Sequence, residues 1–186
     1  MQDKIKPVIE FLDSNEYKRD KLYILGNCSL YLQGLRKEEP KDYDILIYDG
    51  DRFDVDMPSG RVDGILFHLA LLPKDFSTRA KLYFEYKGVK IYLLDIADII
   101  INKISGYHMI KHRNSIINDI SKAGKDVVFG LLADIKQQEF TPVREGVFRQ
   151  NIRDFEYDNS VTSITRAFRA VKNFLTPEKK NVIDET

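Results

Sequence analysis

The sequence predicts an α/β (α+β) protein in which helices flank a small mixed β-sheet, with a helical extension at the C-terminal end. Short stretches rich in β-branched and aromatic residues, such as 42–48 and 61–69, read as strands. Other stretches have apolar residues that recur at helical spacing, such as 95–107. The length of 186 residues and the apolar content of 43% suffice for a compact domain with a real core.

Helix and strand signals alternate along the first half of the chain. Ile5, Val8, Ile9 and Leu12 recur at helical spacing and predict a first helix. A short helix between the first two strands has a polar start at Asn27 or Ser29, either of which is expected to cap it. The predicted elements are a helix at about 2–17, a strand at 22–25, a helix at 29–35, a charged connector at 36–41 and a strand at 42–48.

The second half contains further strands and then mainly helices. The predicted elements are a possible strand at 52–57, a strand at 61–69, a helix starting at 76, a hairpin and strand at 86–93, a helix opened by Asp95, and helices at 113–123 and 127–135. An irregular connection is expected up to 157, followed by a last helix from Ser160. We therefore expect a domain at 1–125 and a helical arm at 126–186.

The last predicted helix carries an apolar stripe, formed by Val161, Ile164, Phe168, Val171 and Leu175. Such a stripe is usually packed inside its own domain. Because the long connection separates it from the rest, it is also a candidate surface for self-association or for a protein partner.

Composition limits the location and the partners of the chain. Lys and Arg total 29, as do Asp and Glu, so no overall charge draws it to nucleic acid or a membrane. A single cysteine excludes an internal disulfide and suits a reducing compartment. The N-terminus lacks the apolar run of a signal peptide, and the longest apolar run is too short to span a bilayer. We expect a soluble, cytoplasmic protein.

Two short motifs point to phosphate chemistry. Asp42 and Asp44 alternate with apolar residues on a predicted strand, so both carboxylates point the same way. Neighbouring carboxylates repel each other unless a cation lies between them. Upstream, Gly26 allows a sharp turn whose free N–H groups suit phosphate. A phosphate-binding turn beside a carboxylate pair is what metal-assisted phosphoryl or nucleotidyl transfer requires.

These motifs resemble the signature of the nucleotidyltransferase superfamily, which has the polymerase-β-like fold. The resemblance is carried by residues 25–29 (Leu-Gly-Asn-Cys-Ser) and 42–45 (Asp-Tyr-Asp-Ile), with Asn27 standing where the family has a Gly or Ser. The strand and helix at 89–104, followed by Lys103, Arg113 and Asp119, are similar to nucleotidyltransferase-like proteins of the abortive-infection toxin type. The resemblance covers about residues 20–125.

The resemblance implies transfer of an NMP from an NTP to a hydroxyl acceptor, which could be RNA, a protein or a small molecule. It implies two Mg²⁺ ions held by Asp42, Asp44 and a third carboxylate from a neighbouring strand. Asp63 is the candidate for that third position, with Asp54 and Asp56 as competitors. The triphosphate is expected to contact Gly26, Asn27, Ser29 and Lys103.

Each of these residues also has a plainer interpretation. The carboxylates could lie on a solvated strand face, Asn27 and Ser29 could only cap a helix, and Lys103 could extend its ammonium along the helix surface into water. Many members of this fold have lost catalysis. The alternative is therefore an inactive structural component of a larger assembly, such as a phage particle or a toxin–antitoxin complex.

Overall fold

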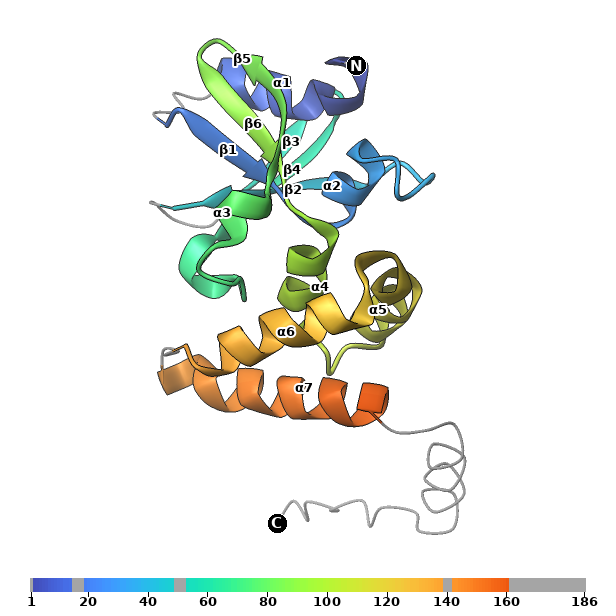
Figure 1. Ribbon diagram of the computed structural model, residues 1–186. Coiled ribbons are helices and arrows are strands. Elements are labelled where there is room, and N and C mark those ends of the chain that lie inside the picture. Colours follow the sequence, from blue (N-terminus) through green and yellow to red (C-terminus); the bar gives the residue numbers. More distant parts are fainter. Residues whose placement is uncertain (1, 15–18, 49–52, 139–141, 161–186) are drawn as a thin grey trace, which may run out of the picture.

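A mixed six-stranded sheet forms the centre of the molecule (Figure 1). The computed structural model describes residues 2–14, 19–48, 53–138 and 142–160. The strand order is β3-β4-β2-β1-β6-β5, and β1 runs parallel to β6 and β2 parallel to β4, whereas the other pairs are antiparallel. The strands are β1 (Lys21–Ile24), β2 (Asp42–Ile47), β3 (Asp54–Met57), β4 (Gly60–Leu66), β5 (Lys81–Tyr86) and β6 (Val89–Leu93).

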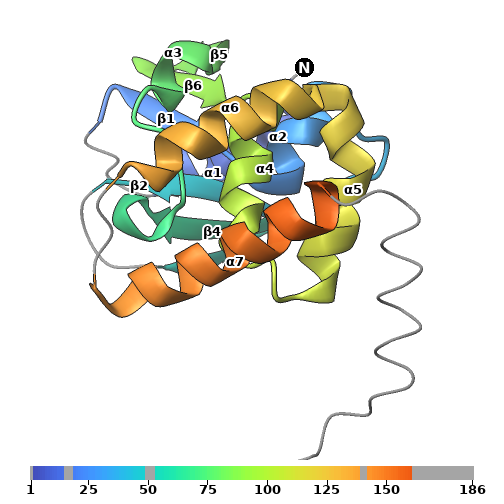
Figure 2. The ribbon, with the colours of Figure 1, turned by 60° about the horizontal axis from the view of Figure 1, so that its bottom comes forward.

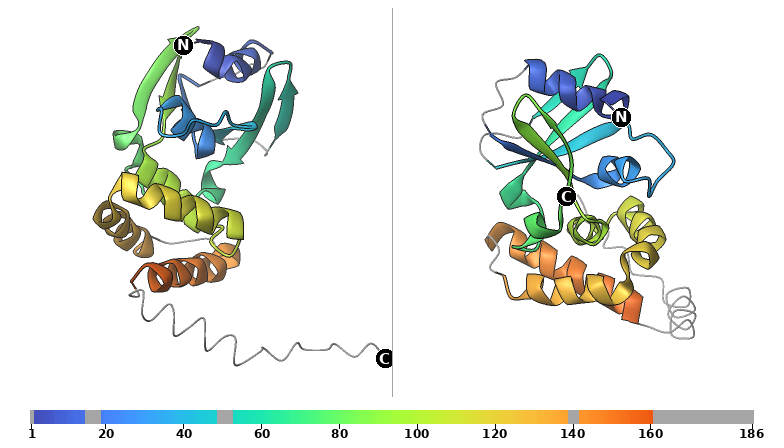
Figure 3. Two further views of the ribbon diagram at one scale, coloured as in Figure 1. Left: turned by 90° about the vertical axis from the view of Figure 1, so that its right-hand side faces the viewer. Right: turned by 45° about the horizontal axis from the view of Figure 1, so that its top comes forward.

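Helices cover both faces of this sheet, which confirms the predicted fold class. On one face, a 3₁₀ turn (Gln2–Ile5) and α1 (Lys6–Ser14) bury Ile5, Val8 and Phe11 against the strands. Figure 3 shows α1 on the side of the sheet away from the C-terminal helices. The other helices are α2 (Gly26–Leu32), a 3₁₀ turn (Phe67–Leu69), α3 (Phe76–Arg79), α4 (Ile96–Ile104), α5 (Ile110–Ala123), α6 (Lys125–Lys136) and α7 (Pro142–Ser160).

Helix α4 links the sheet to the C-terminal helices. It starts directly after β6, and the Asp95 carboxylate caps it by accepting a hydrogen bond from the Ala97 N–H at 2.8 Å. Almost every residue of α4 is buried, because α4 lies between the sheet and α6 and α7 (Figures 1 and 2). One apolar core therefore runs from Leu25 and Leu46 of the sheet region to Leu132 of α6 and Phe155 of α7.

The largest difference from the prediction lies between residues 136 and 157, where an irregular connection was expected. This expectation is wrong: most of the segment belongs to the 19-residue helix α7. Phe148, Ile152 and Phe155 recur at helical spacing and are buried against the core. The many charged residues between them conceal this weak apolar stripe. The predicted apolar stripe from Val161 to Leu175 lies outside the described residues.

Two smaller differences concern local structure. After α3, residues Lys81–Tyr86 form β5, the edge strand that pairs with β6, where the sequence pattern predicted no strand. Helix α2 begins at Gly26, three positions before the predicted start at 29. Among the described residues, none of the helices combines the length and apolar composition that crossing a bilayer requires.

Candidate functional site

The two motifs singled out in the sequence meet where β1 and β2 pair. The Leu25 N–H donates to the Asp44 carbonyl oxygen at 3.0 Å, and Gly26 then turns the chain with φ +67°. A Cβ atom at position 26 would lie 2.1 Å from Asp44 Oδ2. The Asp44 carboxylate therefore lies against the bare backbone of the turn, and both this contact and the backbone angle require glycine at position 26.

Asp44 also belongs to a cluster of charges on three neighbouring strands. Residues that lie side by side on adjacent strands point to the same face of a sheet. The register gives two such rows across β2, β4 and β3, which are Asp42–Arg61–Asp56 and Asp44–Asp63–Asp54. We call these six residues the acidic grid, because they place five carboxylates around one guanidinium.

The acidic grid lies on the sheet face that carries α4. Asp44 alternates with Leu46, and Asp63 with Ile65, so each pair shares one face. Leu46 and Ile65 both pack in the core beneath the C-terminal helices. The carboxylates therefore continue the face on which α4 and Lys103 lie.

Arg61 is the cation within the acidic grid. Its Nε lies 2.5 Å from Asp63 Oδ1, and its Nη2 lies 2.9 Å from Asp54 Oδ2. The bond to Asp63 raises the pKa of the Arg61 guanidinium above its usual value. Of the three candidates for a third carboxylate, Asp63 lies directly beside Asp44, whereas Asp54 is one strand farther away and Asp56 lies in the other row. One oxygen of Asp63 is already paired with Arg61.

The residues fit Mg²⁺ in one particular way. Within the described ranges, no group of three or more His, Cys, Asp or Glu side chains converges as a ligand set for a metal. Mg²⁺, however, is usually bound through one or two carboxylates together with water and substrate phosphates. Asp42 and Asp44, which share a strand face, supply such a carboxylate pair. The donor set therefore suits a metal that arrives with a phosphorylated ligand.

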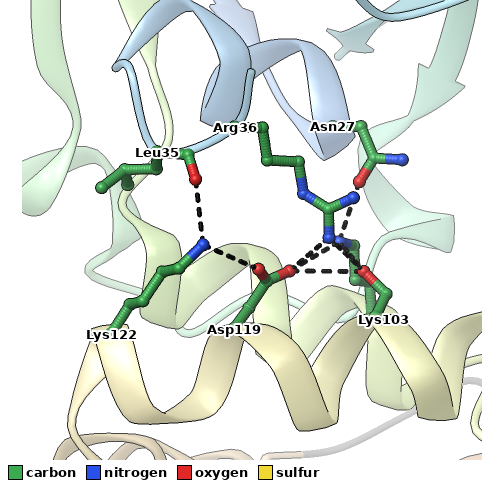
Figure 4. Close-up of polar contacts among 7 residues, drawn as sticks. Asn27, Leu35, Arg36, Lys103, Asp119 and Lys122 are labelled. Atoms are coloured by element: carbon green, nitrogen blue, oxygen red, sulfur yellow. Dashed lines mark hydrogen bonds and ion pairs between the residues drawn. The ribbon is translucent and has the colours of Figure 1, made fainter. Parts of the chain in front are cut away.

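Lys103 of α4 contacts the other side of the turn (Figure 4). Its Nζ donates to Asn27 Oδ1 at 3.0 Å and to Ser115 Oγ at 2.6 Å, and it lies 3.5 Å from Asp119 Oδ2. Lys103 is only 8% exposed, so its ammonium does not extend into water along the helix surface. Burial lowers the pKa of Lys103 to about 8, although the Asp119 charge acts in the opposite direction.

The Asp119 carboxylate of α5 forms ion pairs with three cationic side chains. Besides Lys103, its carboxylate accepts from Arg36 Nη2 at 2.7 Å and lies 3.7 Å from Lys122 Nζ. Arg36 also donates to Ser115 Oγ, and Lys122 to the Leu35 carbonyl oxygen. We call Arg36, Lys103, Lys122 and Asp119 the cationic cluster. Three positive charges surround one buried carboxylate, so the cationic cluster has a net positive charge beside the turn. That charge can attract an anion.

The turn at Gly26 and Asn27 therefore separates two regions of opposite charge. Gly26 touches Asp44 of the acidic grid, and Asn27 binds Lys103 of the cationic cluster. Asn27 is itself exposed, so the turn is accessible to a ligand. This arrangement places a cationic surface on one side of the turn and carboxylates on the other, which are the two kinds of group that contact a polyanion and its counter-ion.

Ser29 and Arg113 make other contacts than the sequence suggested. Leu25 is the N-cap of α2 and no side chain caps that helix, so the expectation that Asn27 or Ser29 caps it is wrong. Ser29 is buried, and its hydroxyl donates to the Leu94 carbonyl oxygen at 3.0 Å. Arg113 donates to the Tyr107 carbonyl oxygen and lies over the Tyr107 ring, away from the contacts to Asp119.

Three residues were not predicted from the sequence. Arg36 and Lys122 belong to the cationic cluster, and Ser115 lies beside it. Ser115, Asp119 and Lys122 are spaced at i, i+4 and i+7 on α5, so they share one helix face. That spacing could have identified Ser115 and Lys122 once Asp119 was chosen. No local pattern marks Arg36, because only the folded loop after α2 brings it 2.7 Å from Asp119.

Compared with known proteins, the chain matches no family model, no curated protein and no solved structure. Function is therefore inferred from the contacts described above.

Proposed function

We propose that the chain is a metal-dependent nucleotidyltransferase that moves an NMP from an NTP to a hydroxyl acceptor. The observation that carries this proposal is the position of the Gly26–Asn27 turn, which touches Asp44 on one side and Lys103 on the other. A triphosphate on this turn would have cations along one side and a carboxylate pair along the other. The resemblance of the two motifs to the nucleotidyltransferase superfamily supports the same conclusion.

The cationic cluster would hold the phosphates. Lys103 and Arg36 supply positive charge, and Asp119 keeps both near the turn. Lys103 has a lowered pKa because it is buried, and the negative charge of a triphosphate would favour its protonated form.

Asp42 and Asp44 would hold Mg²⁺, with Asp63 beside them as a third carboxylate. When bound, the metal polarises the α-phosphate and lowers the pKa of the acceptor hydroxyl. The acceptor class and the base of the NTP stay open. Ser29 is left out of the phosphate-binding set, because the Leu94 carbonyl oxygen already accepts its hydroxyl hydrogen.

A transfer assay with an NTP labelled at the α-phosphate tests this proposal. Asp44→Asn removes the carboxylate charge but keeps the side-chain volume, so transfer should be abolished with little loss of stability. Asp126→Asn, at an exposed position on α6, is the matched control and should transfer normally. Full activity of Asp44→Asn would contradict the proposed function.

One observation favours a second candidate, an inactive component of a larger assembly. Arg61 already supplies a cation to the acidic grid, so the carboxylates have a structural partner without a metal. On this hypothesis, contacts to other subunits or to a protein partner would come from the apolar stripe between Val161 and Leu175. Phe168→Asp in the full chain should then abolish self-association in sedimentation experiments. A monomer that binds NTP would instead favour the enzyme.

A further inference from the structure

We propose that the apolar stripe between Val161 and Leu175 docks on an exposed face of α5 in the same chain. That face is formed by Ile110 and Ile117, and we call these two residues the α5 apolar face. The contact does not require the chain to be an enzyme. Because α5 also carries Asp119, docking would support the helix that holds the cationic cluster together.

The α5 apolar face holds the two most exposed large apolar side chains among the described residues. Ile110 is 75% exposed and Ile117 is 60% exposed. They lie seven positions apart on one helix, so they point to the same side of it. Asp119 points almost the opposite way, toward the cationic cluster. Burial of two isoleucine side chains is favourable, so an apolar segment within reach gains stability by covering them.

The last turn of α7 places the start of the stripe beside α5. The Asn159 carbonyl oxygen accepts a hydrogen bond from Lys125 Nζ, two positions after α5 ends. Asp158 Oδ2 accepts from the Tyr107 hydroxyl at 3.1 Å, three positions before α5 begins. Figure 2 shows the end of α7 next to α5. The sequence that continues from Ser160 therefore starts within reach of the α5 apolar face.

The stripe matches the α5 apolar face in length and in spacing. Its apolar residues are separated by three and four positions in turn, so the pattern repeats every seven, which is also the separation of Ile110 and Ile117. Helices that share a seven-residue apolar repeat pack side by side along it. The two isoleucines lie about 10 Å apart along α5, and residues 161–175 would span about 22 Å as a helix. The stripe is therefore long enough to cover both after a turn that redirects the chain.

Covalent attachment favours the chain's own stripe over the stripe of a second copy. Val161 directly follows the last residue of α7, so the stripe is tethered close to α5. A segment on a short tether has an effective concentration on the order of millimolar. A second copy supplies its stripe only at the concentration of the protein in solution. The α5 apolar face should therefore be covered within one chain even in dilute samples.

A tryptophan placed in the stripe of the full chain tests this contact, because the chain has no tryptophan of its own. In Phe168→Trp, docking should shift the fluorescence maximum to the blue of the urea-unfolded protein, at every protein concentration. Adding Ile110→Gln and Ile117→Gln removes the apolar surface but keeps a good helix former, so the maximum should move back to the red. The matched control adds Leu82→Gln and Val147→Gln, which are also exposed apolar positions but lie on β5 and in the first half of α7. It should leave the maximum unchanged.

Three results would overturn the proposal. A maximum in folded Phe168→Trp that equals that of the unfolded protein would mean that water surrounds the stripe. A blue-shifted maximum that the two α5 substitutions leave unchanged would mean that the stripe docks elsewhere. A blue shift that disappears on dilution would mean that a second copy covers the α5 apolar face. If Phe168→Trp does not fold, Val171→Trp at another position of the stripe is read by the same three criteria.

Discussion

The carboxylate of Asp44 fills the space in which a side chain at position 26 would lie. A Cβ atom on Gly26 would be 2.1 Å from Asp44 Oδ2, and the φ angle of +67° independently disfavours any residue with a side chain. Two motifs that are separated by the whole of α2 are thus joined by direct contact. This contact holds the turn after β1 against β2.

Gly26→Ala should destabilise the chain more than the backbone angle alone explains. Gly34 provides the control, because it has a similar φ of +75° but nothing within 4 Å of the place that a Cβ atom would take. Gly34→Ala should lose about 1 kcal/mol from the left-handed backbone. Gly26→Ala should lose about 1–3 kcal/mol more from the collision with Asp44. Urea unfolding measures both, and equal losses would contradict the contact.

The buried Lys103 should make stability depend on pH above neutrality. Burial lowers its pKa to about 8 in the folded chain, against an ordinary value of 10.5. Between these values the unfolded chain binds more protons, so stability should rise with pH by at most about 1.4 kcal/mol per pH unit. Below pH 8 the group is protonated in both states and adds no slope.

Lys103→Met is the variant that isolates this effect. Other groups titrate equally in both chains, so the difference in unfolding free energy, wild type minus variant, should increase between pH 8 and pH 10.5. Urea unfolding at several pH values measures this difference. Parallel curves for the two proteins would show that Lys103 keeps its ordinary pKa.

Asp119→Asn should destabilise the chain, because the three cations of the cationic cluster would repel each other without the shared carboxylate. Asp119 is 1% exposed and is the carboxylate that Arg36, Lys103 and Lys122 share. Removing one partner of a buried ion pair costs about 3 kcal/mol or more, because a charge is left without compensation. Asp134→Asn, at an exposed position on α6, should change stability by less than about 0.5 kcal/mol.

Thermal or urea unfolding of Asp119→Asn and Asp134→Asn measures how much stability each substitution removes. A loss at Asp119 that is no larger than the loss at Asp134 would mean that the three cations do not depend on the shared carboxylate. A large loss at Asp119 would confirm that the cluster is held together around it.

Most strands were predictable from the sequence because their signal is local, and β5 was the exception. Alternation of apolar and polar residues identified β2 and β4, and the sharp turn at Gly26 followed from the residue type. The pairing of Asp63 with Asp44 was expected only from a resemblance, since strand register depends on contacts between distant segments. The acidic grid as a whole could not be read from the sequence for the same reason.

Helix α7 and the contact between Arg36 and Asp119 were not predicted, and each has a physical reason. Helix α7 buries only a narrow apolar stripe, with Phe148, Ile152 and Phe155 set among charged residues, so its periodicity is weak. Arg36 lies 83 positions from Asp119 along the chain, and a single charged residue in a loop carries no sign of its partner. Sequence spacing predicts which residues share one face of a helix or strand. It does not predict which loops pack against that face.

The most direct test of the proposed nucleotide site is calorimetric titration with ATP, GTP, CTP and UTP in the presence of Mg²⁺. The wild type is compared with the Asp42→Asn/Asp44→Asn double variant, and the same titrations are repeated without metal. We predict metal-dependent binding of at least one nucleotide to the wild type and its loss in the double variant. A well-folded wild type that binds none of the four nucleotides would contradict the proposed function.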